Sequence, residues 1–158
     1  MSGIPHSIPT ELVQAYRNAS YVVSVSNQEI ILKVDQSNRE LSALMKGSGV
    51  KSAAFLTAYN PFSQELTFEE NQLRHGRLAA AVNSLGLEFF PGEGRDDLGR
   101  WPSERSILVL GIEFEDAEYL ADEYGQNAFI WIEADQGDAK LHLRYPSGDE
   151  GVVHEAGI

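Results

Sequence analysis

The 158-residue sequence has no cysteine, which excludes disulfides, thiolate metal ligands and a cysteine nucleophile. It also lacks a run of roughly 18 apolar residues, and no basic segment leads into an apolar run at its start. We therefore expect neither a membrane span nor a signal peptide. The missing cysteines fit a reducing compartment, so the sequence predicts a soluble, cytoplasmic protein.

Basic residues are scarce as well. Twelve lysines and arginines face 24 acidic residues, which gives a net charge of -12. Such an excess opposes non-specific binding to phosphate backbones and anionic lipid, so we expect no nucleic-acid and no membrane partner. A local basic pocket could still hold an anion. His142 and His154 lack the i, i+4 partners of a zinc-binding helix, and we expect no metal site.

The length favours a single domain over residues 1–158, with flexible ends at residues 1–9 and 146–158. Thr10 can cap a first helix, and Ser37 with Glu40 forms a capping box for a second one. Two β-rich runs between them are separated by a short polar turn, which predicts a hairpin. The expected elements are a helix over Glu11–Asn18, strands over Tyr21–Val25 and Glu29–Val34, and a helix over Asn38–Lys46.

The stretch from residue 53 to residue 75 is the most informative. Ala53–Tyr59 is apolar on both faces, as in a central strand that is covered on both sides. Asn60 precedes a proline, which biases it to an extended conformation. Thr67 with Glu70 forms a capping box, and Gly86 supplies a left-handed end, so the longest helix should span about Phe68 to Leu85.

The inward stripe of this helix is apolar at Leu78, Val82 and Leu85 but polar in its first two turns. Arg74 is the critical member of the polar part, because a buried guanidinium needs an internal carboxylate or an anionic ligand. One interpretation is a structural ion pair between Arg74 and Glu104. The other is that Arg74 is held ready for an anion, and this is the interpretation we favour from the sequence.

The remaining chain predicts a strand, a glycine-rich loop, a strand, a helix and two strands. The last strand alternates apolar and polar residues, the pattern of a half-exposed edge strand. From Ala53 onward the order is strand, helix, strand, strand, helix, strand, which matches a ferredoxin-like split βαβ core of an α+β fold. The N-terminal helix and hairpin and the C-terminal edge strand extend this core. The expected bounds are Leu87–Phe90, a loop over Pro91–Arg105, Ser106–Ile112, a helix from Glu115 closed by Gly125, Asn127–Glu133 and Ala139–Tyr145.

In that topology, polar side chains from five segments converge at one end of the sheet. If the protein is an enzyme, which the sequence leaves open, Glu104 or His75 would be the acid or base. The structural alternatives are that Asn60 and Asn71 cap the turn after the strand, that Trp101 covers a core edge and that His75 is a partly exposed helix residue. The ligand-binding candidates are Thr57, Asn60, Asn71, Arg74, Arg95, Trp101, Glu104, Ser106 and Gln126.

With these residues in view, the chain resembles a bacterial family catalogued as domain of unknown function 3293. Tyr59 departs from the tryptophan that is more frequent in the first motif of that family. The family has no assigned activity or catalytic residues, so the resemblance implies no function, and no cofactor follows from it. The motifs that carry the resemblance are T-A-Y-N-P at Thr57–Pro61, the pair Asn71 and Arg74, G-R-D at Gly94–Asp96, W-P-S-E-R-S at Trp101–Ser106 and G-Q-N-A at Gly125–Ala128.

Two hypotheses of function remain from the sequence. The first is a pocket at one end of the sheet that binds a small polar or anionic molecule. The alternative is a non-enzymatic interaction module, in which the polar cluster is structural and the edge strand over residues 139–145 pairs with a protein partner.

Overall fold

The computed structural model describes residues 6–148. An α+β fold is confirmed, with helices and one sheet in the following order. The elements are α1 (Thr10–Asn18), β1 (Ser20–Val25), β2 (Gln28–Leu32), α2 (Arg39–Gly47), β3 (Ser52–Thr57), a 3-10 turn η1 (Pro61–Ser63), α3 (Phe68–Ser84), β4 (Phe89–Arg95), β5 (Glu104–Leu110), α4 (Phe114–Glu123), β6 (Ala128–Glu133) and β7 (Asp138–Leu143).

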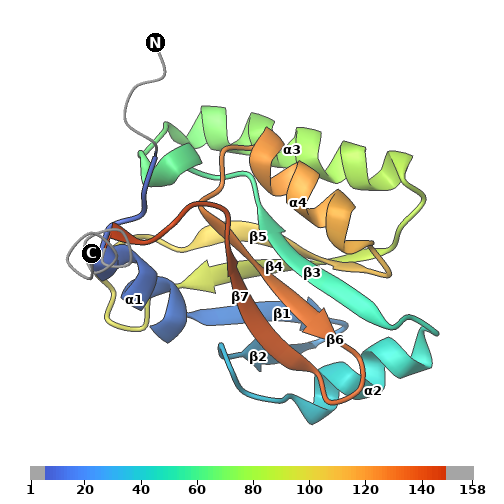
Figure 1. The fold of residues 1–158 in the computed structure, drawn as a ribbon. Coiled ribbons are helices and arrows are strands. Elements are labelled where there is room, and N and C mark those ends of the chain that lie inside the picture. Colours follow the sequence, from blue (N-terminus) through green and yellow to red (C-terminus); the bar gives the residue numbers. More distant parts are fainter. Residues whose placement is uncertain (1–5, 149–158) are drawn as a thin grey trace.

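A single curled sheet contains all seven strands, in the order β2-β1-β4-β5-β3-β6-β7 (Figure 1). Every neighbouring pair is antiparallel. The predicted central strand, β3, lies between β5 and β6, so its expected adjacency to the strand near residues 106–112 is confirmed. The hairpin of β1 and β2 is confirmed too, and β7 is an edge strand as expected.

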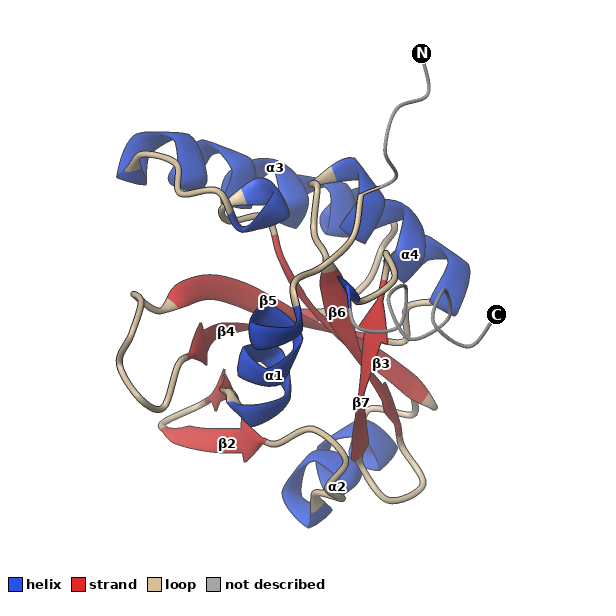
Figure 2. Cartoon of the chain, turned by 60° about the vertical axis from the view of Figure 1, so that its left-hand side comes forward, coloured by secondary structure: helices blue, strands red, loops and turns tan. Residues whose placement is uncertain are grey.

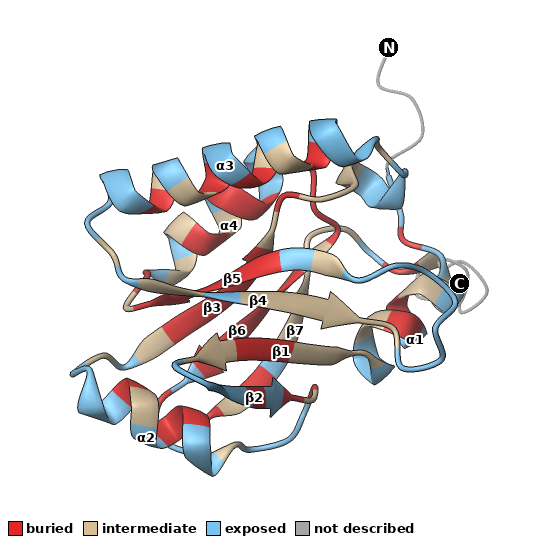
Figure 3. Cartoon of the chain, turned by 180° about the vertical axis from the view of Figure 1, so that it is seen from behind, coloured by how far each residue is buried: buried red, intermediate tan, exposed pale blue. Residues whose placement is uncertain are grey.

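The two faces of the sheet have separate cores. Leu56, Ile107 and Phe129 pack on the face that is covered by α3 and α4. Their sequence neighbours Phe55, Leu108 and Ile130 point to the inside of the curl, where they join the hairpin and α2. Because successive side chains of a strand alternate between faces, this double burial explains why β3 and β5 are apolar throughout. Figure 3 shows the buried residues concentrated in these strands beneath α3.

Helix α1 lies over the open side of the curl, between the strands of the hairpin side and β7 (Figure 2). Ahead of it, Ile8 is fully buried and forms a parallel bridge with Ser147. For residues 1–5 and 149–158, the predicted flexibility of the chain ends lies outside the described residues. Between residues 6 and 148 no helix is long and apolar enough to cross a membrane.

The signals at the ends of the longest helix are confirmed. Thr67 and Glu70 form the reciprocal capping box, and Gly86 follows with a φ of 74°. The inward stripe ends earlier than expected, because Leu85 is the C-cap residue and is 46% exposed. In α2 the cap is Asn38, whose side chain accepts from the Leu41 amide, and not Ser37. Thr10 lies within α1 as its first residue and does not cap it.

The predicted loop over Pro91–Arg105 is wrong in its first part, where β4 continues to Arg95. The glycines of this segment favoured a loop in the prediction, because glycine ordinarily weakens a strand. In this strand Gly92 is needed for close packing, since a Cβ there would lie 2.4 Å from the Val22 carbonyl oxygen of β1. The Gly92-Glu93-Gly94 run is therefore a strand that lets β1 and the Phe55 ring approach closely.

Candidate functional site

A cavity of about 280 Å³ lies inside the curl, at the end that α1 covers. It is bounded by α1, by β1, β3, β4, β5, β6 and β7, by the loops that follow β3 and β4, and by the loop before β6. Its polar lining comes from segments far apart in the sequence. The polar lining residues are Tyr16, Tyr21, Thr57, Asn60, Ser63, Glu65, Glu104, Ser106, Gln126 and Asn127.

Glu104 is the central acidic group of this cavity. It begins β5, with its backbone paired to Gly94, and its carboxylate accepts a hydrogen bond of 2.8 Å from the Asn60 side-chain amide. Burial raises the pKa of Glu104 above its usual value, and the Asn60 hydrogen bond only partly counters this. Among the described residues that line the cavity there is no lysine, arginine or histidine. The carboxylate therefore has an amide partner and no cationic one.

Asn60 holds the turn beside Glu104. The expected extended conformation is wrong, because its φ of 45° and ψ of 68° are left-handed. Asparagine tolerates this region better than most residues. Its side-chain oxygen accepts from the Leu66 backbone amide at 3.0 Å and from the Asn71 side chain at 2.9 Å. The Asn60 backbone amide in turn donates to the Asn71 side-chain oxygen at 2.9 Å, and these bonds offset the strain of the turn.

The turn continues in a conformation that is rare for residues other than glycine. Phe62 and Ser63 also have positive φ values, of 55° and 60°. The Ser63 hydroxyl lies 2.9 Å from the Tyr16 hydroxyl, and the Asn127 side-chain amide donates to both oxygens. The side-chain oxygen of Asn127 lies 2.8 Å from the Nε2 atom of His6. This network fastens α1 over the cavity.

Aromatic rings form much of the remaining wall, namely Tyr16, Tyr21, Phe55 and Trp101. Burial raises the pKa of Tyr16 and, more strongly, that of Tyr21, whose hydroxyl donates to the Tyr16 carbonyl at 2.6 Å. Both hydroxyls stay protonated at neutral pH. Sequence reasoning missed both tyrosines as site residues, because they appear there as members of an apolar helix stripe and of a hairpin strand.

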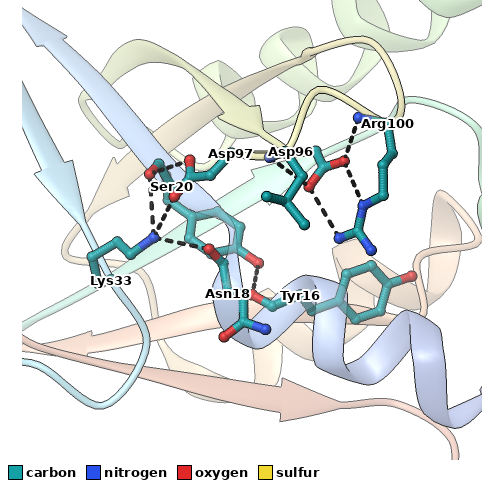
Figure 4. Close-up of polar contacts among 9 residues, drawn as sticks. Tyr16, Asn18, Ser20, Lys33, Asp96, Asp97 and Arg100 are labelled. Carbon is teal, nitrogen blue, oxygen red and sulfur yellow. Dashed lines mark hydrogen bonds and ion pairs between the residues drawn. The ribbon is translucent and has the colours of Figure 1, made fainter.

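The loop that carries Trp101 is tied down at its base (Figure 4). Asp96 accepts from the backbone and the guanidinium of Arg100. Asp97 accepts from Lys33 and from Ser20, each at 2.7 Å, which joins the loop to the hairpin. The Arg100 guanidinium lies 4.9 Å from the centre of the Trp101 ring. Trp101 lines the cavity and is 42% exposed, so it forms part of the cavity rim.

The expected convergence is partial. Asn71 is buried behind Asn60 and supports it without lining the cavity. Arg95 pairs with Glu93 and Glu29 on the outer part of the sheet. Six of the nine candidates line the cavity, and these are Thr57, Asn60, Trp101, Glu104, Ser106 and Gln126.

Arg74 does not pair with Glu104, so the interpretation as a structural ion pair is wrong. Arg74 does not line the cavity either, so an anion in the cavity would not contact it. Its guanidinium donates to the Ala58 carbonyl at 2.8 Å and to the Tyr124 carbonyl, and it lies over the Tyr124 ring. Arg74 thus ties α3 to the ends of β3 and α4. Backbone carbonyls satisfy a guanidinium without any carboxylate, which residue spacing does not reveal.

His75 and Glu104, the two acid or base candidates, do not lie in one site. His75 is 8% exposed, so the alternative of a partly exposed helix residue is wrong, and His75 does not line the cavity. Its Nδ1 atom has no hydrogen-bond partner among the described residues. Desolvation, together with the charge of Arg105, lowers its pKa. Within residues 6–148 there is also no group of three or more acidic or histidine side chains that could hold a metal ion.

Residues 56–129 match the model of a family described as Protein of unknown function (DUF3293). The resemblance drawn from the motifs is confirmed over this segment, which runs from the end of β3 to the start of β6. It includes Asn60, Glu104 and Gln126, whereas Tyr16 and Tyr21 precede it. A search of the curated proteins and a search of the solved structures returned no match.

Proposed function

We propose that the chain, whose residues 56–129 belong to this family of unknown function, binds a small polar molecule in the cavity around Glu104. The observation that carries the proposal is a partly buried carboxylate inside a cavity, with one amide donor and no cation among the described residues around it. Burying an ionisable group without a cation costs stability, and such costs are commonly retained at functional sites.

The shape and the lining of the cavity support the proposal. Ligand cavities are concave and largely apolar, with a few polar groups that converge from different elements. The rings of Phe55 and Tyr21 supply the apolar wall, and Thr57, Ser106 and Gln126 add hydroxyl and amide groups. The turn contains three non-glycine residues with positive φ, two of which, Asn60 and Ser63, line the cavity, and strain of this kind clusters at functional sites.

We further propose that the fold which positions these groups is an extended ferredoxin-like unit. Strands β4, β5, β3 and β6 lie side by side in that order, and α3 and α4 pack on one face of them. This order supports a split βαβ unit to which β1, β2 and β7 are added at the edges. The curl of the added strands encloses the cavity, so the extensions complete the site.

A thermal-shift panel of nucleotides, sugar phosphates, carboxylates, amines and neutral polyols tests the proposed function. We expect at least one class to stabilise the protein, by about 2.7 kcal/mol at a ligand concentration of 100 times its dissociation constant. Gly94 lines the cavity, and a Cβ there would lie 3.9 Å from its nearest neighbour, the Tyr21 ring. Gly94→Leu should therefore fold, occupy part of the cavity and abolish the shift, while Gly94→Ala reduces it less.

The opposite result would favour the interaction module. If no class shifts the melting temperature, and a protein partner is lost when proline replaces Lys140 in the edge strand β7, the cavity is structural. A shift that Gly94→Leu leaves unchanged would place binding elsewhere on the molecule.

A further inference from the structure

We propose that the cavity selects a small molecule with a protonated amine next to an apolar or aromatic body, and that the amine binds to Glu104. This inference rests on the proposed function and narrows it to one class of ligand. It replaces the anionic ligand that the sequence suggested.

The charge of the lining selects against anions. Glu104 lies inside the cavity and Glu65 on its exposed rim, and no basic residue is present among the described residues that line it. The two arginines among the sequence candidates lie outside the cavity: Arg74 is bound to two backbone carbonyls, and Arg95 is paired with Glu93 and Glu29. An anion entering there would meet two carboxylates and no counter-charge, whereas an ammonium group would supply the cation that Glu104 lacks.

The rings beside Glu104 suit a cation with an apolar body. The ring faces of tyrosine and tryptophan attract ammonium groups, and aromatic walls also pack against an apolar substituent. Tyr16, Tyr21 and Trp101 lie around the same cavity, and the charge of Glu104 contributes to the raised pKa of both tyrosines. The carboxylate and the tyrosines are therefore close enough to act on one ligand.

The position of Glu104 explains why an amine would be recognised specifically. Its carboxylate is partly buried and, among the described residues, accepts a hydrogen bond from the Asn60 amide alone, so further hydrogen-bonding capacity remains for an N–H donor. A charged donor strengthens such a bond, and the low local dielectric strengthens it further. A neutral alcohol of the same shape would keep the hydrogen bond but lose the charge.

Titration calorimetry with three matched probes tests the inference. The probes are 2-phenylethylamine, 2-phenylethanol and phenylacetate, which share an aromatic body and differ in charge. We expect the amine to bind about tenfold to hundredfold more tightly than the alcohol, because a charged partner strengthens the hydrogen bond, and phenylacetate not to bind. A second pair, isopentylamine and isopentanol, checks that the preference does not depend on the ring.

Two variants locate the effect. Glu104→Gln keeps the size and the acceptor for Asn60 but removes the charge, and it should abolish the preference for the amine. Glu69→Gln removes an exposed carboxylate of α3 that does not line the cavity, and it should preserve the preference. The amine preference should also increase as the pH rises and Glu104 ionises. Tyr16, Tyr21 and Glu65 are the other titratable groups that face it across the cavity, and Glu104→Gln should remove this pH dependence.

The outcomes distinguish a failure of the amine inference from a failure of the proposed binding pocket. Equal or tighter binding of an alcohol or of phenylacetate overturns the amine inference and leaves the binding pocket in place. An amine preference that persists in Glu104→Gln also overturns it, because the general negative field of the protein would then be responsible. If neither amine binds at millimolar concentration, the inference fails, and the pocket itself fails only if the broad panel gives no shift.

Discussion

Replacing Asn60 by alanine is expected to lower the free energy of unfolding by about 3 to 5 kcal/mol, a large effect for one surface turn. Alanine would leave the Leu66 amide, the Asn71 side chain and the Glu104 carboxylate each without a partner that Asn60 now supplies. Each such orphaned group costs about 1 to 3 kcal/mol when buried, and partial exposure lowers the sum. Alanine also tolerates a φ of 45° less well than asparagine.

Chemical denaturation of two further variants separates these causes. Asn60→Gly relieves the left-handed strain and still loses the side-chain bonds, so it should remain destabilised by most of that amount. Asn83→Ala, on the exposed side of α3, is the control and should change stability by less than about 0.5 kcal/mol. If Asn60→Gly is as stable as the wild type, the network is dispensable and the turn is held by its backbone alone.

Arg74→Met is expected to lower the free energy of unfolding by about 2 to 3 kcal/mol. If Arg74 were instead an anion-binding residue, the substitution should leave the stability unchanged or raise it. The variant removes the charged donor that now binds the Ala58 carbonyl. Ala58 is fully buried, so water cannot replace that donor. Hydrogen bonds to charged groups contribute about 1.5 to 3 kcal/mol. Losing the Arg74 hydrogen bond to the Tyr124 carbonyl should cost less free energy, because the Gln126 side chain also donates to this oxygen at 3.1 Å.

Denaturant melts of Arg74→Met and Arg77→Met give the comparison on one helix. Arg77 is exposed, so its replacement should be nearly neutral. Arg74→Met should also leave ligand shifts from the panel intact at temperatures where it is folded, because the residue does not line the cavity. Unchanged stability together with lost ligand binding would restore the anion-site interpretation.

Local signals predicted much of the fold. The capping box at Thr67 and the glycine at position 86 set the longest helix, and the doubly apolar strands set the centre of the sheet. Errors arose where tertiary contacts override local preference. Gly92 and Gly94 look like a loop but form a strand, because the hairpin packs against them. Asn60 looks extended before its proline, yet its side-chain bonds hold it left-handed.

The sequence predicted the part of the candidate site that lies at one end of the central strands. Thr57, Ser106 and Glu104 lie on β3 and β5, whose pairing follows from the predicted topology. The part supplied by α1 and β1 could not be predicted, because the curl that brings Tyr16 and Tyr21 over those strands leaves no local pattern in the sequence. The curl also decides that Arg74 lies outside the cavity, since α3 packs on the opposite face of the sheet.

The central claim is that Glu104 is an ionisable carboxyl held in a cavity for a ligand at the expense of stability. A pKa that is raised in the folded state means that Glu104 stabilises the fold fully below the usual carboxyl range and that this contribution is lost as the pH rises through the raised value. Glutamine has the same shape and does not titrate. The unfolding free energies of the wild type and Glu104→Gln, without ligand, should therefore diverge with pH.

The most direct measurement is this difference in unfolding free energy, determined by denaturant melts from about pH 4 to about pH 8. The account predicts similar stability of the two proteins at the acidic end and a gain for Glu104→Gln at the alkaline end, on the order of 1 kcal/mol. A Glu104→Gln protein that is less stable than the wild type at about pH 8, with the difference growing as the pH rises, would contradict the account, because the carboxylate would then stabilise the fold.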